Sequence, residues 1–296
     1  MQALAERLAE ALTGARLVGY EPLGFTGLKT ATPPPESVVG HTVEGVGRRG
    51  KYVALEFDGG ERILVHLSQA GRLDIEDPPK KTKPRGSVVR LRFRRAGGFA
   101  DRPPGEPAPA AGERTTENET AVLVREFGTE RKAGWWVLAK GDDGPLERLG
   151  PEVDSDGFAE FILHGDDKRR VHTILRDQSS VAGVGRGYSD DALHRARLSP
   201  YASLASLDAG ERQRLLDAVR EVLATGLERE RERTGGLSAN KLGEHFDVHG
   251  RAGTPCPVCG ETLRRISYES HEVVYCPNCQ TGGKVLADRR MSRLVR

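Results

Sequence analysis

Four cysteines near the end of the chain constrain its fold more than any other feature. They are Cys256, Cys259, Cys276 and Cys279, and the 296-residue sequence contains no others. Each pair has the spacing C-x2-C, and sixteen residues separate the pairs, which is typical of a four-thiolate zinc site. Each C-x-x-C turn brings two sulfurs within reach of one metal ion, and the sequence between the pairs can fold back as a β-hairpin. We therefore expect a zinc-ribbon hairpin.

A disulfide pairing is the alternative use of these cysteines. The sequence has no run of eighteen apolar residues, and its beginning does not resemble a signal peptide, so we expect a cytoplasmic protein. Thiols stay reduced in that compartment, which favours zinc. Four protein ligands leave the ion no open position, so it would hold structure and do no chemistry.

The charged residues are unevenly distributed along the chain. The net charge is only +2, with 37% hydrophobic and 30% charged residues, as in an ordinary soluble protein of more than one domain. Basic residues concentrate in residues 80–95 and 280–296, which indicates local anion-binding surfaces. Solvated faces without a ligand are the alternative for both stretches.

The first half of the sequence predicts a β-sandwich or barrel fronted by one helix. Apolar residues at helical spacing predict that helix over residues 1–12. Strand patterns follow, and Asp58-Gly59-Gly60 predicts a hairpin between the first two of them. These strands cover residues 51–57, 62–66, 87–93, 121–124 and 135–139. Residues 103–120 are rich in Pro, Ala, Gly, Glu and Thr, and we expect a mobile insertion there.

Residues 142–156 are expected to form a linker, because two Gly-Pro pairs break regular structure there. The sequence after this linker predicts helices. Ser189 or Asp190 is a candidate N-cap for the third helix, because a short polar side chain accepts bonds from first-turn amides. The last helix has an apolar stripe that predicts core packing. The four expected helices cover residues 158–163, 171–175, 190–196 and 207–231.

A glycine-rich stretch, D-Q-S-S-V-A-G-V-G-R-G-Y at residues 177–188, lies between two of these helices. Gly183, Gly185 and Gly187 predict a tight turn with exposed N–H groups before a helix, and such a turn can bind a phosphate. A glycine turn without a ligand is the ordinary alternative, since such turns are common.

Other short motifs accompany this stretch. Near the C-terminus they are H-G-R-x-G-x-P-C-x-x-C-G and Y-C-P-x-C-Q, and earlier in the chain they are R-R-G-K-Y at 48–52, H-L-S-Q-A-G-R-L at 66–73, R-E-F-G at 125–128 and L-G-P-E at 149–152. Taken together, these motifs resemble the formamidopyrimidine-DNA glycosylase and endonuclease VIII family, and the resemblance covers nearly the whole chain.

The resemblance implies a multidomain α+β protein. Residues 1–140 would form a catalytic-type β-sandwich with a front helix, and residues 141–156 a linker. Residues 157–243 would form a helix–two-turn–helix DNA-binding domain, and residues 244–296 a zinc-ribbon hairpin with a basic tail. The family also implies a bacterial, nucleoid-associated monomer that binds damaged double-stranded DNA and no membrane. One structural zinc ion per chain is its expected cofactor.

The activity implied by the resemblance is base-excision repair by a DNA glycosylase with abasic-site lyase activity. Family members flip the damaged base out of the stack, because the sugar cannot otherwise be reached. The amine of an N-terminal proline attacks the sugar carbon and forms a Schiff base, and elimination then nicks the strand.

The positions that match the family's motifs supply the expected site residues. Lys51 is the expected catalytic residue, which touches the phosphates at the lesion; an ordinary lysine at a strand start is the alternative. The expected metal ligands are the four cysteines. The expected DNA-binding residues are Lys51, Gln69, Arg125, Phe127, Gly185, Arg186, Arg251 and His271.

Several positions depart from the family pattern. Arg186 stands where the family has a phosphate-binding asparagine, and it can bind an anion through two N–H groups. His271 replaces an arginine, so its phosphate contact would depend on protonation, unless it is simply an exposed histidine. Gln69 and Glu126 replace two of the three residues that fill the gap left by a flipped base, and only the aromatic Phe127 is kept. Glu126 would be unfavourable beside a phosphate-rich duplex.

The largest departure from the family pattern is at the beginning of the sequence. The family begins M-P-E-L-P-E-V, whereas this sequence begins M-Q-A-L, which aligns with the residues after that motif. A start codon assigned too far downstream would explain the difference, because GUG encodes valine internally and methionine at a start. Genuine loss is the alternative.

Three functions fit these features to different degrees. The first is a glycosylase with lyase activity, and the second is a relative that binds damaged or abasic DNA without cutting it. The third is a zinc-ribbon protein of transcription or translation, against which the sandwich and the glycine turn argue.

Overall fold

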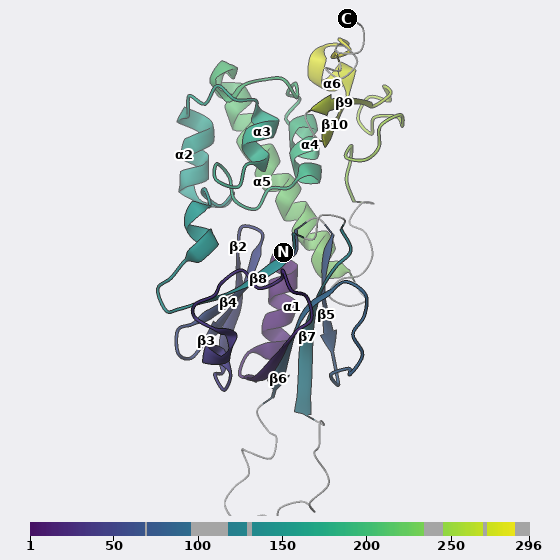
Figure 1. The fold of residues 1–296 in the computed structure, drawn as a ribbon. Coiled ribbons are helices and arrows are strands. Elements are labelled where there is room, and N and C mark those ends of the chain that lie inside the picture. Colours follow the sequence, from purple (N-terminus) through teal and green to yellow (C-terminus); the bar gives the residue numbers. More distant parts are fainter. Residues whose placement is uncertain (69, 96–117, 129–131, 234–244, 269–270, 288–296) are drawn as a thin grey trace, which may run out of the picture. The chain divides into compact units, whose positions relative to one another are not determined.

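The structure is a computed structural model that describes residues 1–68, 70–95, 118–128, 132–233, 245–268 and 271–287. Its internal contacts divide the chain into two compact units (Figure 1). The first contains residues 1–147, and the second contains the described residues from 148 onward. Among these described residues, no helix is both long enough and apolar enough to cross a bilayer.

Two four-stranded antiparallel sheets make up the first unit, as the β-sandwich prediction requires. One sheet contains, in order, β1 (Arg16–Pro22), β6 (Ser87–Arg94), β7 (Glu119–Glu126) and β5 (Gly71–Glu76). The other contains β2 (Val43–Arg49), β3 (Tyr52–Phe57), β4 (Arg62–His66) and β8 (Gly134–Leu138). Helix α1 (Gln2–Leu12) packs against β2, and a short 3-10 turn, η1 (Pro35–Val38), follows β1. The predicted front helix and the β3–β4 hairpin are both confirmed.

The core of the sandwich follows from alternation along the strands. Every second residue of a strand faces the same side, so one face of each sheet can be apolar throughout. Leu8 and Leu12 of α1 join this core, which places the helix over the sandwich. The alternating strand residues of the core include Val53, Leu55, Phe57, Val89, Leu91, Phe93, Val122 and Val124. Most of the predicted insertion at residues 103–120 lies outside the described residues, although β7 already begins at Glu119.

The arginines of β6 face the other side of their sheet and are paired within the unit. Arg90 is only 1% exposed, and its guanidinium lies 2.8 Å from Glu76 and 2.6 Å from Glu21. Arg92 and Arg94 both bind Glu119, at 2.6 and 2.9 Å. The anion-binding surface expected from residues 80–95 is therefore wrong for these arginines, because carboxylates of the same sheet already neutralise them.

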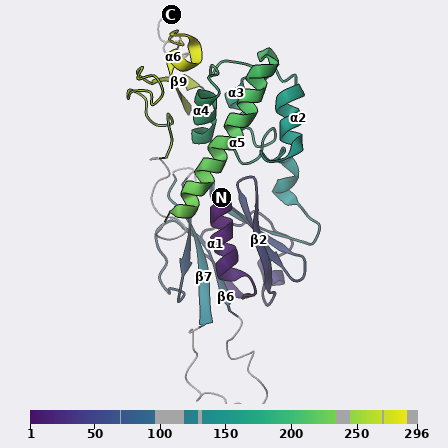
Figure 2. The same cartoon turned by 180° about the vertical axis from the view of Figure 1, so that it is seen from behind.

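The second unit consists of helices followed by a small hairpin (Figure 1). The longest helix of the described residues is α5, which packs against α2 and α4 and lies in the foreground of Figure 2. A capping box between Asp208 and Glu211 fixes the start of α5. The helices are α2 (Asp156–His164), α3 (Val171–Arg176), α4 (Arg186–Arg195) and α5 (Ala209–Glu232), with η5 (Leu204–Ser206) before α5. The 3-10 turn η4 (Gly144–Arg148) lies where the first unit ends and the second begins. The hairpin contains β9 (Arg264–Tyr268), β10 (His271–Tyr275) and the short α6 (Pro277–Thr281).

Helix α4 begins four residues earlier than its sequence pattern predicted. It starts at Arg186 with Gly185 as the N-cap, and no side chain caps it. Ser189 and Asp190 are buried inside the helix, so the prediction that one of them caps it is wrong. The Asp190 carboxylate does not accept hydrogen bonds from the first turn of its own helix. It accepts them from His249 and Val274, which lie far along the chain.

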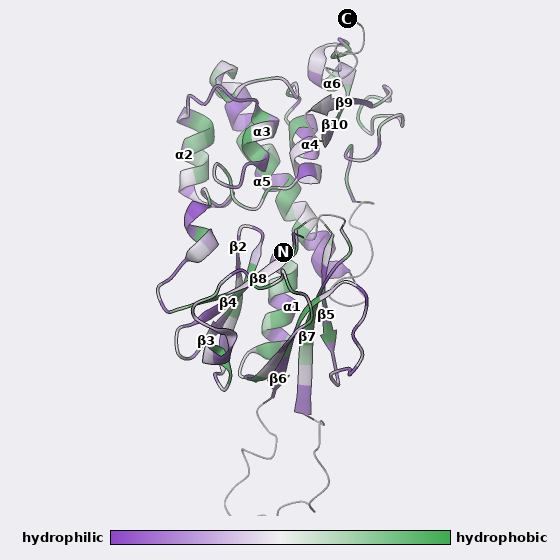
Figure 3. Ribbon diagram, in the orientation of Figure 1, coloured by the Kyte–Doolittle hydropathy of each residue, from purple (hydrophilic) through white to green (hydrophobic). Residues whose placement is uncertain are grey.

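One side of α4 carries Gly187, Asp190, Asp191 and His194. Residues spaced by three, four and seven positions lie along one helix face, and we call these four residues the docking stripe. A Cβ at position 187 would come within 2.2 Å of the Phe246 ring, so only glycine allows that ring to pack there. The opposite side of α4 is apolar and belongs to the helical core through Ala192, Leu193 and Ala196. Both characters appear along α4 in Figure 3.

Asp191 holds the segment that leads into the hairpin. Its carboxylate is 4% exposed and accepts the backbone N–H groups of Asp247, Val248 and His249 at 2.7, 3.0 and 3.1 Å. Asp190 beside it accepts the His249 ring at 2.7 Å and the backbone N–H of Val274 in β10 at 3.3 Å. These bonds explain why two carboxylates can be buried in a helix, since all the partners are N–H donors.

Replacing Asp191 with alanine should therefore destabilise the second unit. Three buried N–H groups would lose their acceptor, and we expect a loss on the order of 3 kcal/mol in the free energy of unfolding. Urea unfolding followed by circular dichroism measures it. Asp217→Ala is the matched control, because Asp217 is exposed on α5 and bonds only Gln213 among the described residues. A similar loss in both variants would contradict the role given to Asp191.

Candidate functional site

The four cysteines form one cluster at the hairpin. All four are free thiols, so the disulfide alternative is wrong. The Sγ atoms of Cys256 and Cys279 lie 3.9 Å apart, and those of Cys259 and Cys276 lie 3.5 Å apart. Tetrahedral Zn–S bonds of about 2.3 Å separate neighbouring sulfurs by about 3.8 Å. The cluster is therefore consistent with a structural zinc site.

The local backbone directs N–H groups at two of these sulfurs. The N–H of Val258 points to Cys256 Sγ at 3.4 Å, and the N–H of Cys279 points to Cys276 Sγ at the same distance. Gly260 takes a positive φ of 76° to close the first turn, which an L side chain rarely adopts. N–H donors directed at sulfur favour the thiolate, the form that binds a metal.

His194 also belongs to this cluster, although no sequence pattern pointed to it. Its ring nitrogen and the Sγ atoms of Cys256, Cys276 and Cys279 all lie within 4.8 Å of one another. His194 comes from α4, more than sixty residues before the first cysteine, and belongs to no metal-binding motif. The only signal in the sequence is its place on the docking stripe, three residues after Asp191.

The D-Q-S motif builds the glycine turn that precedes α4. Gln178 accepts the N–H of Gly183 at 3.0 Å and donates to the carbonyl of Val184 at 3.0 Å. Burial alone would raise the pKa of Asp177, but hydrogen bonds from Ser179 and from the Arg169 guanidinium lower it to about 2. Asp177 is thus ionised at neutral pH and keeps the turn closed through those bonds.

The three glycines of the turn serve different purposes. Gly183 has a φ of 91°, so the turn itself requires glycine there. Gly187 makes room for the ring of Phe246. Gly185 has ordinary backbone angles, and a Cβ on it would meet no atom within 4 Å. Open space at Gly185, beside the first turn of α4, is compatible with the approach of a ligand to the backbone.

Arg186 is the first residue of α4 and is half-buried. Within the described part of the chain, its guanidinium makes no hydrogen bond or ion pair, and its charge opposes the rise in the pKa of His249 that the hydrogen bond to Asp190 causes. Its position adds a full positive charge to the partial positive charge of a helix N-terminus. Arg186 and the uncapped amides of this turn can together hold an anion such as a phosphate.

The segment before the first cysteine lies beside this turn. Phe246 packs on Gly187, and its ring centroid is 5.2 Å from that of His249. The hydrogen bond to Asp190 raises the pKa of His249, while burial raises the pKa of the Asp190 carboxyl. Arg251 follows two residues later in an exposed turn. His271 begins β10 opposite Tyr268, and only its backbone is described. The structure thus gathers Gly185, Arg186 and the start of the Arg251 turn in one region.

Lys51 lies in the first unit, at the tip of a two-residue turn. Arg49 pairs with Tyr52 across β2 and β3, so Gly50 and Lys51 form the whole connection, and Gly50 has a φ of 56°. The guanidinium of Arg48 donates to the side chain of Gln2 at 3.2 Å. The N-terminal end of α1 therefore lies beside the hairpin that carries Lys51.

His66 is a second residue near Lys51 that sequence reasoning did not select. Burial and the charge of Lys51 lower its pKa, while the carboxylate of Glu126 raises it. Its ring packs on Tyr52, with centroids 4.8 Å apart. The only sequence signal was the H-L-S-Q-A-G-R-L motif that contains it. His66 is therefore held largely neutral beside the lysine.

The remaining predicted residues of the first unit have separate environments. Arg125 donates to Asp74 at 2.7 Å and lies over the Phe127 ring at 5.1 Å, while Phe127 itself is 54% exposed. Glu126 is only 9% exposed and accepts two backbone N–H groups, from residues 132 and 133, at 2.7 and 2.9 Å. The repulsion expected between Glu126 and DNA is therefore weakened, because the carboxylate points into its own loop. Gln69 lies outside the described residues.

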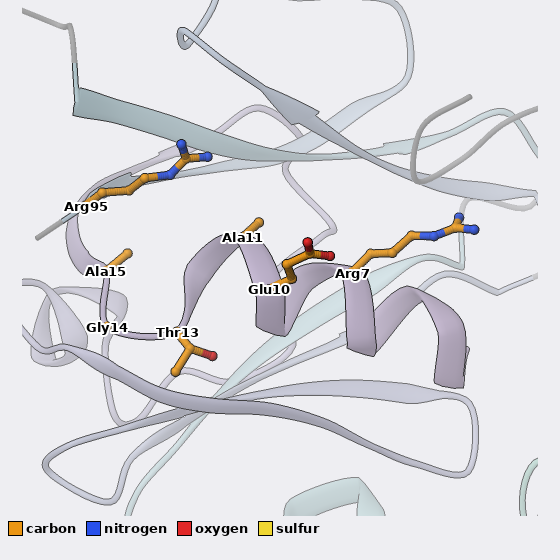
Figure 4. A pocket seen from close by; sticks show the side chains of 7 residues that line it. All are labelled: Arg7, Glu10, Ala11, Thr13, Gly14, Ala15 and Arg95. Carbon is orange, nitrogen blue, oxygen red and sulfur yellow. The ribbon is translucent and has the colours of Figure 1, made fainter. Parts of the chain in front are cut away.

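A hollow of about 580 Å³ lies in the first unit, beside the second half of α1 (Figure 4). Arg7 and Glu10 reach into it from α1, and Arg95 reaches in from the end of β6. It contains none of the site residues predicted from the sequence, and its charged lining residues are two arginines and one glutamate. We assign no role to it.

Comparison with protein families identifies two regions of the chain. Residues 1–102 match the formamidopyrimidine-DNA glycosylase N-terminal domain, and residues 147–236 match the formamidopyrimidine-DNA glycosylase H2TH domain. A formamidopyrimidine-DNA glycosylase of Roseiflexus sp. is 32% identical over 299 residues, which cover 95% of this chain and 97% of the relative. An uncharacterized formamidopyrimidine-DNA glycosylase-like protein of Mycobacterium tuberculosis is 39% identical over 151 residues, or 50% of this chain and 94% of that protein.

Solved structures agree with this comparison. The MutM (Fpg) protein from Thermus thermophilus matches with a TM-score of 0.74 at 26% identity, covering 96% of this chain and 97% of that one. A Lactococcus lactis formamidopyrimidine-DNA glycosylase bound to DNA containing an AP site matches with a TM-score of 0.74 at 18% identity, over 94% and 97% of the two chains. The second likeness concerns the fold alone.

Proposed function

Because this chain belongs to the formamidopyrimidine-DNA glycosylase family, we propose that it repairs damaged DNA in the bacterial cytoplasm. It binds damaged double-stranded DNA at the nucleoid, flips the damaged nucleotide, cleaves its glycosidic bond and nicks the strand at the abasic site. The observation that carries this proposal is Arg186, a half-buried guanidinium at the start of α4 without an ion-pair partner among the described residues.

The proposed DNA contacts divide into phosphate contacts and one wedge. Arg186 and the amides after Gly185 bind one phosphate, and Arg251 and His271 bind others from the hairpin side. Lys51 binds the phosphates at the lesion. Exposed Phe127 enters the stack where the flipped base leaves, with Arg125 over its ring. Gln69 is the other proposed residue at that gap.

In the proposed chemistry, a primary or secondary amine attacks the sugar carbon that carries the base. The amine gives up its proton, and the base leaves with the electrons of its bond and takes up a proton. The nitrogen lone pair then breaks the bond from this carbon to the ring oxygen, which is protonated, so an imine forms between the amine and the opened sugar. The imine acidifies the neighbouring sugar proton, whose removal expels the phosphate on the 3′ side. Lys51 holds that phosphate, and neutral His66 beside it is a proposed proton carrier.

The contact between Gln2 and Arg48 supports this arrangement within the first unit. An amine that precedes α1 would lie at the hairpin of Lys51. A displacement of even one ångström from the sugar carbon would cost a large factor in rate. The second candidate function, binding without cleavage, applies if no amine of the chain reaches that carbon.

Zinc is the proposed metal of the cysteine cluster. Cys256, Cys259, Cys276 and Cys279 would hold one ion, which fixes the hairpin and takes no part in the chemistry. Because His271 lies in β10, between the two pairs of cysteines, loss of the metal would also remove its phosphate contact.

The protein purified without chelator should contain one zinc ion per chain. A strong chelator should remove it and unfold the hairpin, because binding and local folding are coupled. Elemental analysis measures the stoichiometry, and limited proteolysis near residues 256–279 measures the unfolding. Protein free of stoichiometric zinc, or a hairpin unchanged by chelation, would contradict the assignment.

Replacing Arg186 with alanine should weaken DNA binding with little dependence on sequence. Loss of one phosphate contact should also reduce the slope of log affinity against log salt by about 1. Fluorescence anisotropy with an abasic duplex over a range of salt measures both. Arg195→Ala is the matched control, because Arg195 lies at the other end of α4 and pairs with Glu221 at 2.8 Å. If Arg186→Ala leaves both affinity and slope unchanged, the glycine turn does not bind DNA.

Borohydride trapping on abasic and oxidised-base duplexes separates the two candidate functions. The sequence as given would be compared with a form in which Pro-Glu-Leu-Pro-Glu precedes residue 1 and Met1 is replaced by valine. We expect the extended form to be trapped covalently and the shorter form far less. Lys51→Ala in the extended form should reduce trapping by about 10-fold or more. An extended form that traps on no substrate would leave only the binding function.

A further inference from the structure

His194 lies against the cysteine cluster but comes from another part of the chain. Its Nε2 atom is 3.2 Å from Cys256 Sγ, and the residue is only 5% exposed. It stands in the last turn of α4, on the docking stripe, three residues after Asp191. The cluster thus contains five side chains with metal-binding atoms, for a site that needs four.

The distances distinguish a ligand from a hydrogen-bond donor. A nitrogen and a sulfur bound to the same tetrahedral zinc ion would lie about 3.5 Å apart, from bonds of about 2.0 and 2.3 Å. The observed 3.2 Å is shorter and is ordinary for an N–H group pointing to sulfur. The two sulfur pairs at 3.5 and 3.9 Å instead bracket the separation expected of two thiolates on one ion.

Charge gives an independent reason for a donor at this position. Four thiolates around one Zn²⁺ leave two net negative charges, and Cys256 is 3% exposed, so water does little to stabilise the charge on its sulfur. Cys256 Sγ already accepts the N–H of Val258 at 3.4 Å. A neutral imidazole with its proton on Nε2 supplies a second donor to the same sulfur.

We propose that His194 is an outer-sphere residue of the metal site, which donates its Nε2–H to the thiolate of Cys256 and so holds the metal and α4 together. This inference rests on the zinc assignment of the cysteine cluster and goes beyond it. Residues outside the ligand set that hydrogen-bond a ligand orient it and stabilise its charged form.

The position of His194 gives this bond a consequence for the anion-binding turn. Arg186 begins the same helix of ten residues whose last turn carries His194. A metal ion bound at the cysteine cluster would therefore help to hold the C-terminal end of α4, in addition to the bonds of Asp190 and Asp191. Loss of the metal would therefore also affect the position of the Arg186 turn, because the same helix joins the two.

Zinc affinity of the full chain tests the proposal, measured by competition with a chromophoric chelator. His194→Phe keeps a buried ring but removes the N–H, so the affinity should fall roughly 10- to 100-fold. His194→Gln keeps a donor and should lose less. His172→Phe is the matched control, because His172 is also buried but donates to the carbonyl of Pro200 at 2.9 Å. Its zinc affinity should equal that of the parent chain.

Cobalt substitution determines whether His194 is instead a direct ligand. The charge-transfer bands of the Co²⁺ form should show four thiolates in the parent chain and in His194→Phe alike. Cys259→Ala should lose one thiolate and most of its affinity. If Cys259→Ala binds zinc as tightly as the parent chain, or the parent shows three thiolates, His194 is a ligand and the proposal is wrong. Equal affinity of His194→Phe and the parent would also overturn it, whereas a parent chain without metal would overturn the zinc assignment itself.

Discussion

The second unit depends on the bonds between the docking stripe of α4 and the segment that leads into the cysteine hairpin. Asp191 binds three consecutive backbone N–H groups, Asp190 binds His249 and β10, and Gly187 admits the ring of Phe246. A helix of ten residues is about 15 Å long and bends little. Its two ends therefore cannot move independently, so the same helix positions both the glycine turn before Arg186 and the segment that leads to the cysteine cluster.

Buried carboxylates are a costly way to join two segments, because an ionised group loses its hydration. Three backbone N–H groups from one short segment offset part of this cost for Asp191, although burial still raises the pKa of its carboxyl. An apolar contact would hold the same segments without fixing their register. Three N–H groups on one carboxylate specify both the position and the direction of residues 247–249. That directional control suits a segment from which Arg251 is presented two residues later.

The first unit manages its charges differently. The arginines of its sheet form ion pairs with carboxylates, and Arg90, which pairs with Glu76 and Glu21, is almost inaccessible to solvent. The cations offered at its surface are therefore fewer than the composition suggests. Lys51 places a positive charge at the tip of the hairpin between β2 and β3, and the partly buried His66 lies near it. Glu126 closes a loop in the same neighbourhood and leaves Phe127 exposed at the end of its strand.

Local patterns in the sequence determined much of this protein. The cysteine spacing predicted the hairpin cluster, strand alternation predicted the sandwich, and a series of short motifs indicated the family. Each depends on residues close together in the chain, where spacing alone fixes which side chains share a turn or a face. The tertiary structure decided the rest. The sequence predicts a cap at Asp190 and gives no sign of the role of His194, because their partners lie about sixty to eighty residues away and leave no periodic pattern near α4. The pairing of Arg90 and the inward turn of Glu126 were decided in the same way, since a charge alone does not show which partner the fold will bring to it.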